Sequence, residues 1–134
     1  METAKTAAQL LKPFVRQYTV LLTTYRRDGT PVATPVNMAV EGERAFVRTW
    51  STAGKAKRIR NNPHVAVAPS TIGGRPTGPA IQARARQLSG EEAAHAAQAL
   101  ARKHPFAHGL IVPWFHRLRG YQTIHLELTP VIED

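Results

Sequence analysis

The clearest chemical signal in the sequence is a run of hydroxyl, glycine and basic residues between positions 48 and 63. The pattern predicts a strand that turns into a short basic helix, with Ser51 and Gly54 in the turn. A helix that begins there directs free backbone N–H groups toward one point, where Lys55 adds a positive charge. Arg48, on the preceding strand, can supply a bidentate guanidinium. These residues predict a phosphate-binding site; a solvent-exposed basic helix with an ordinary Ser/Thr cap is the alternative interpretation.

Other kinds of active site have little support in the sequence. It contains no cysteine, no Gly-x-Ser-x-Gly and no His-Glu-x-x-His. His104 and His108 have helical spacing, but Pro105 between them prevents a shared helix face. We therefore predict no metal site and assign no catalytic residue. If the protein is an enzyme, a bound cofactor supplies the difficult chemistry.

Composition limits the classes of partner. The 134 residues carry a formal net charge of +9, which favours nucleic acid, an acidic membrane surface or a phosphorylated cofactor. No run approaches the ~20 apolar residues of a membrane span. Aromatic residues make up only 7%, without a stacking platform on one strand, so nucleic-acid binding is the weaker alternative. Length, the lack of cysteine and the absence of a signal-peptide run predict one cytoplasmic domain over residues 1–134.

Hydrophobic patterns divide the chain into about six strands with helices between and around them. The expected strands are Tyr18–Tyr25, Val32–Val40, Arg44–Trp50, His64–Ala68, Ala80–Leu88 and Gln122–Leu128. The expected helices are Lys5–Lys12, the basic helix after Gly54, and an alanine-rich helix up to Lys103 with a capping box of Ser89 and Glu92. Residues 106–119 are expected to form short helical turns. Pro35 has no N–H, so its strand should lie at a sheet edge or carry a bulge.

The expected sheet is largely antiparallel, because its first three strands follow one another as hairpins. Closing such a sheet into a barrel removes its exposed edges. The first strand is apolar on both faces, since Val20 and Leu22 alternate with Leu21. One face can fill the barrel, and the other needs cover from a helix or from a second copy of the protein.

Three motifs occur in an order that resembles a known family. They are Asp28-Gly29-Thr30-Pro31, Thr34-Pro35-Val36-Asn37, and Arg58-x-x-Asn61-Asn62-Pro63-x-Val65 after the turn into Gly54-Lys55. In this order they resemble the pyridoxamine 5′-phosphate oxidase-like split β-barrel proteins, over roughly residues 8–132. They are most similar to the small actinobacterial branch that uses the deazaflavin coenzyme F420 in place of FMN. The resemblance implies a mainly β fold with flanking helices: a homodimer of six-stranded antiparallel split barrels, FMN-binding in type, with the cofactor in a groove at the dimer interface.

The resemblance also implies which residues contact the cofactor. Lys55 is expected to bind the phosphate, aided by Arg48, Thr49 and Ser51. The residues expected against the ring system are Thr34, Pro35, Val36 and Asn37, and the candidates from the partner subunit are Arg84 and Trp114. The Arg-x-x-x-Leu-Lys phosphate motif of true pyridoxamine phosphate oxidases is absent around Tyr18–Tyr25, and their C-terminal substrate motif is absent too. These departures argue against vitamin B6 oxidation and, more weakly, against FMN.

The implied function is an F420-dependent oxidoreductase. It would take hydride from the reduced coenzyme and deliver it to an enone, an imine or a similar electron-poor small molecule. An FMN-dependent reductase of the same fold and a non-catalytic coenzyme carrier are the alternatives, ahead of a nucleic-acid-binding basic domain. The acceptor, the direction of the reaction and any proton donor stay open at this point.

Overall fold

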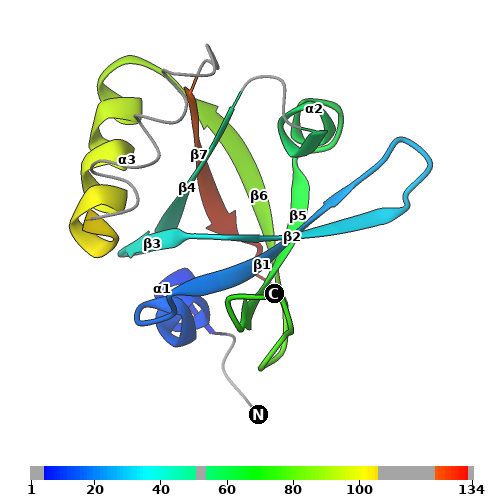
Figure 1. Cartoon of the computed structure of the whole chain (residues 1–134), viewed down its shortest axis with the longest axis horizontal. Helices are drawn as coiled ribbons and strands as arrows, with labels where there is room; N and C mark the ends of the chain where they lie inside the picture. The colour runs from blue at the N-terminus through cyan, green and yellow to red at the C-terminus, as the bar shows by residue number, and fades with distance from the viewer. Residues whose placement is uncertain (1–4, 51–53, 106–122, 133–134) are drawn as a thin grey trace.

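The fold is mainly β, with strands curled into one sheet and helices around it (Figure 1). The computed structural model describes residues 5–50, 54–105 and 123–132. Its helices are α1 (Ala7–Leu11), the 3-10 helix η1 (Lys12–Phe14), α2 (Gly54–Asn61) and α3 (Gly90–Lys103). Its strands are β1 (Thr19–Tyr25), β2 (Pro31–Val36), β3 (Met38–Glu41), β4 (Arg44–Trp50), β5 (His64–Ser70), β6 (Ile81–Leu88) and β7 (Thr123–Pro130). The segment 106–119, expected to form helical turns, lies outside the described residues.

The described sheet has seven strands rather than the six expected, because the predicted strand Val32–Val40 is divided at Asn37. Its first half, β2, pairs with β1, and its second half, β3, pairs with β4. The strand order is β2-β1-β5-β6-β7-β4-β3, and every ladder is antiparallel. The first and last strands of this order are consecutive in the chain, so the sheet curls until its two edges meet at Asn37. Pro35 lies in edge strand β2, as its missing N–H predicts.

The barrel interior is filled by alternate residues of the strands. The main core cluster includes Val20 and Leu22 of β1, Val47 of β4 and Leu126 of β7. Side chains from α1, η1 and α2 belong to the same cluster: Leu11, Phe14, Ala56 and Ile59. A second cluster joins α3 to the outer face of the sheet and consists of Ala39, Phe46, Leu88, Ala96 and Leu100. Leu21 belongs to neither cluster and is half-buried.

The start of α3 differs from the capping box that the sequence predicts. Ser89 is the N-cap residue, but its side chain makes no capping hydrogen bond. Glu92 instead accepts from the guanidinium of Arg86 on β6, at 2.8 Å. This charged partner across the sheet surface competes with the backbone for the carboxylate. The end of the helix at Lys103, before His104 and Pro105, is as predicted.

Lys103, at the end of α3, is half-buried and connects this helix to η1 and β3 by hydrogen bonds. Its Nζ donates to the backbone carbonyl oxygen of Met38 in β3 (2.7 Å) and to that of Phe14 in η1 (3.2 Å). Burial lowers the pKa of Lys103 to about 8, from the 10.5 of an ordinary lysine. The folded protein therefore releases this proton at a lower pH than the unfolded chain does.

We expect Lys103 to make the free energy of unfolding rise with pH between about 8 and 10.5. In that interval the unfolded chain binds more protons, so raising the pH favours the folded state. Lys103→Met keeps the aliphatic stem and removes the titration. Denaturant unfolding across this interval should give a smaller rise for Lys103→Met than for the wild type. Equal pH dependence of the two proteins would contradict the assignment.

Candidate functional site

The division of the strand at Asn37 leaves β2 and the end of β4 unpaired with each other, so an opening lies between their edges. β3 pairs with β4 only as far as Val47, which is opposite Met38. Beyond that pair, residues 48–50 of β4 keep β7 as their neighbour, and β2 pairs with β1 alone among the described strands. The backbone of Thr34–Val36 therefore has an edge without a ladder partner in the described sheet, where a ligand can receive hydrogen bonds.

A cluster of positive charge lies on α2 beside this opening. Lys55 is half-buried, and burial together with the charge of neighbouring Arg58 lowers the pKa of Lys55. The Nε of Arg58 donates to the hydroxyl oxygen of Thr24 on β1. Burial and the charge of Arg26 lower the pKa of Arg58 as well. An anion bound here would favour the charged forms that burial and like charges disfavour.

Gly54 makes this arrangement of α2 possible. A Cβ at position 54 would lie 2.7 Å from Nη1 of Arg58, closer than side-chain atoms approach one another. Because glycine has no side chain, the Arg58 guanidinium can lie against the first turn of the helix. It thereby adds its charge to the helix end at which backbone N–H groups are exposed.

Arg48 and Thr49 are neighbours in sequence but project to opposite faces of β4. Thr49 is 2% exposed, and its Oγ1 has no hydrogen-bond partner within the described part of the chain. Arg48 donates from Nε to Nε2 of His125, its register partner on β7, at 3.1 Å. Since Nε2 accepts, the neutral imidazole carries its proton on Nδ1. Burial lowers the pKa of Arg48.

The structure places the predicted cofactor residues on three elements. Arg48 and Thr49 lie on opposite faces of β4, at the end that precedes α2 and Lys55, and the four edge residues Thr34, Pro35, Val36 and Asn37 lie where the strand divides. Arg84 lies elsewhere, on the exposed face of β6 beside His64 of β5 and Thr129 of β7. Ser51 and Trp114 lie outside the described residues. The role of all these residues in binding a cofactor stays a prediction.

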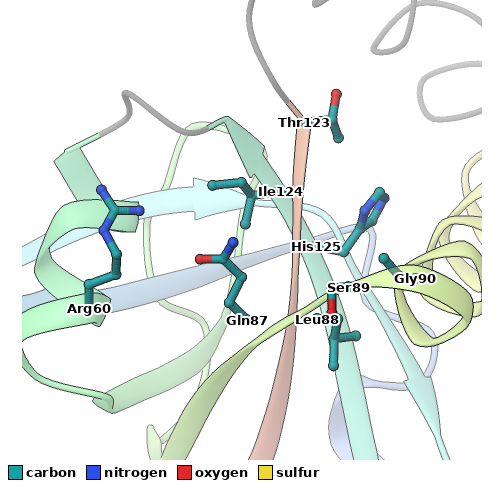
Figure 2. Close-up of a pocket in the computed structure, with 9 residues that line it drawn as sticks. Arg60, Gln87, Leu88, Ser89, Gly90, Thr123, Ile124 and His125 are labelled. Atoms are coloured by element: carbon teal, nitrogen blue, oxygen red, sulfur yellow. The ribbon is translucent and has the colours of Figure 1, made fainter.

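A cavity of about 600 Å³, which the sequence patterns did not indicate, opens between α2, β6, β7 and the start of α3. Figure 2 shows Arg60 of α2 and His125 of β7 on opposite sides of it, with Gln87 of β6 between them. The remaining lining residues are Leu88, Ser89, Gly90, Ala93, Thr123 and Ile124. A signal for it existed at Gln87, because strand alternation places this polar residue on the same face as buried Ala83 and Ala85.

The described residues contain no group of three or more histidine, aspartate or glutamate side chains placed to hold a metal ion. Among the helices that the structure describes, none has the length and apolar character that crossing a bilayer requires.

The family model described as pyridoxamine 5′-phosphate oxidase matches residues 5–130, nearly the whole chain. The chain belongs to the pyridoxamine 5′-phosphate oxidase family. The resemblance seen in the motifs between residues 28 and 65 is thereby confirmed, as is the expected split-barrel fold class. No curated protein matches the chain.

Solved structures that share the fold of this pyridoxamine 5′-phosphate oxidase family member are named for different cofactors. The heme storage protein HutZ from Vibrio cholerae has a TM-score of 0.66 at 18% identity, over 95% of this chain and 92% of that one. An FAD-binding protein from Mesorhizobium loti has a TM-score of 0.62 at 16% identity, over 96% and 90%. An F420 reductase has a TM-score of 0.57 at 17% identity, over 90% and 92%. At these identities the likeness is one of fold.

Proposed function

We propose that this protein is an F420-dependent oxidoreductase that reduces a small, electron-poor acceptor such as an enone or an imine. The observation that carries the proposal is the half-buried pair Lys55 and Arg58, whose charges repel one another beside the opening between β2 and β4. Two cations held partly out of water at a helix start favour a phosphorylated ligand over a neutral one. The F420 reductase among the structures of this fold supports the choice of coenzyme.

The residues at the opening fit the coenzyme, which carries a phosphodiester and a glutamyl tail. Lys55 and Arg58 would hold the phosphate, with Arg48 as a further guanidinium. The buried Thr49 Oγ1, which has no hydrogen-bond partner in the described residues, can donate to an acceptor atom of the bound molecule. The edge of Thr34–Val36, which has no ladder partner in the described sheet, offers backbone hydrogen bonds to a planar ring system. The excess of positive charge, +9 overall, steers such an anion toward the protein.

When bound in its reduced form, the deazaflavin supplies a hydride to the acceptor. The protein's own part is to bind, to orient and to exclude water. The charges on α2 would anchor the polar tail, and the edge residues of β2 would contact the ring system. No residue is proposed as the proton donor, because solvent or the acceptor itself can supply the proton.

The proposed active form is a cytoplasmic homodimer of single-domain chains. Leu21 lies on the face of β1 opposite the barrel core and remains half-buried without joining either core cluster. A second copy that covers this face would remove apolar surface from water. The partner chain is also proposed to complete the coenzyme site through Arg84 and Trp114.

Direct titration tests the choice of coenzyme. We expect apo protein to bind F420 at physiological salt at least about tenfold more tightly than FMN, a difference of about 1.4 kcal/mol. Cofactor fluorescence reports both titrations, and hemin, followed by absorbance, provides a third. Preference for FMN would move the protein to the flavin-dependent reductases. Preference for hemin, or no binding of F420, would overturn the proposal; binding without turnover of any acceptor would make the protein a carrier.

A further inference from the structure

The cavity lined by Arg60, Gln87, Ser89 and His125 is separate from the charges on α2 that the coenzyme proposal uses. Neither Lys55 nor Arg58 lines it, and Arg48, the further guanidinium of that proposal, meets it only through its hydrogen bond to His125. Arg60 lines the cavity from α2, whereas Arg58 reaches β1 through its hydrogen bond to Thr24. The volume of about 600 Å³ falls within the range of about 300–1,000 Å³ that is usual for small-molecule sites.

The described wall of this cavity is rich in hydrogen-bond donors and contains no carboxylate. Arg60 brings a positively charged guanidinium. Gln87, which is exposed near the end of β6, adds an amide. Ser89 makes no capping hydrogen bond to α3, so its hydroxyl can serve a ligand. Such a donor set favours an anion over a neutral or cationic molecule.

The kind of anion follows from the remaining lining. Arg60 is the only lysine or arginine among the nine lining residues. One guanidinium matches the single charge of a carboxylate, with which it forms two parallel hydrogen bonds. Leu88 and Ala93 form an apolar part of the lining beside α3, although Leu88 itself is only 4% exposed. We propose that this cavity binds an organic monocarboxylate, with its carboxylate on Arg60 and its hydrocarbon part against the apolar lining of Leu88 and Ala93 beside α3.

The carboxylate site is held in shape by the sheet behind it. His125 is 9% exposed and lies between its register partners Arg48 of β4 and Leu88 of β6. The hydrogen bond that it accepts from Arg48 fixes the orientation of its ring. Leu88 is packed against α3 in the second core cluster. The walls therefore belong to the folded scaffold, which lowers the entropic cost of binding a ligand.

Binding of trans-cinnamate to the protein without coenzyme tests the proposal. Calorimetry with trans-cinnamate, its neutral amide trans-cinnamamide, and inorganic phosphate separates charge from shape. We expect cinnamate to bind at least about tenfold more tightly than either of the other two. Arg60→Gln should weaken cinnamate binding by about tenfold or more and leave cinnamamide unchanged, since a charge-assisted hydrogen bond contributes about 1.5–3 kcal/mol. Gln87→Glu, which places a negative charge in the cavity, should weaken cinnamate binding as well.

The matched control is Arg75→Gln, which removes the same charge from the exposed loop at the far end of β5. It should leave cinnamate affinity unchanged. Equal losses in Arg75→Gln and Arg60→Gln, equal affinity for cinnamamide, a preference for phosphate, or no binding of cinnamate would each overturn the proposal. Amide shift changes that centre on Lys55 and Arg58 rather than on Gln87 and Ser89 would do so too. No coenzyme is present, so the outcome is independent of the F420 titration; unchanged melting temperatures show that the variants fold.

Discussion

Lys55→Ala is expected to weaken F420 binding by about tenfold to a hundredfold. A charge-assisted hydrogen bond from a partly buried ammonium contributes about 1.5–3 kcal/mol, which corresponds to this range of affinity. Lys55 is half-buried, so water and salt screen it less than they screen an exposed lysine. Fluorescence titration of both proteins with F420 at fixed ionic strength measures the change.

Lys57→Ala is the matched control for this substitution. Lys57 lies two residues along the same helix, is exposed, and carries the same charge. If the affinity depended on net charge alone, the two variants would lose the same amount. We expect Lys57→Ala to lower the affinity by less than about twofold, because exposed charges interact weakly across solvent. A loss in Lys57→Ala as large as that in Lys55→Ala would assign the effect to overall charge and not to a site.

The pH dependence of F420 binding provides a second test of the role of Lys55. Burial and the charge of Arg58 lower the pKa of Lys55, so its proton is lost at a lower pH than that of an ordinary lysine. Affinity for an anion should therefore fall as the pH rises through this lowered pKa. Lys55→Ala should bind F420 weakly at every pH in this range, without the fall in affinity. The missing pH dependence would assign the fall in the wild type to the charge of Lys55.

Most of the fold was predictable because strand alternation and turn residues are local signals. β6 shows this plainly: buried Ala83 and Ala85 alternate with exposed Gln82 and Arg84, as the sequence predicts. The division at Asn37 was not predictable, because the residues on either side of it continue an uninterrupted strand pattern. Which strand each half pairs with depends on how the whole sheet curls, and that is a long-range property.

The candidate site was predictable only in part, for a related reason. The helix start at Gly54 and Lys55 was predictable because its signals are adjacent in the sequence. The order of the motifs around it then indicated the family. The cavity of Arg60, Gln87 and His125 brings together three elements that are far apart in sequence. Likewise, the predicted capping box at Ser89 failed because Glu92 pairs with Arg86 of β6, a partner that only the folded sheet provides.

Leu21→Glu is expected to convert the proposed homodimer into a monomer and to abolish F420 binding with it. Leu21 lies on the outward face of β1, in register with Pro35 of β2 and Ala68 of β5. A charge buried at an interface without a partner costs about 3–5 kcal/mol, so the dimer should dissociate at least about a hundredfold more readily. Two-fold symmetry would bury the new charge twice. Sedimentation across a range of concentrations measures the assembly, and F420 fluorescence measures the site.

Val15→Glu separates a surface effect of the new charge from a loss of the interface. Val15 is 49% exposed, follows η1 and lines a shallow pocket with residues of β3 and α3. It should sediment as the wild type does and bind F420 with the same affinity. If Leu21→Glu stays dimeric, Leu21 lies outside the interface; if wild-type protein is monomeric and still binds F420, the coenzyme site belongs to one chain. The apolar outward face of β1 would then need another explanation, because a half-buried leucine beside an edge strand favours association.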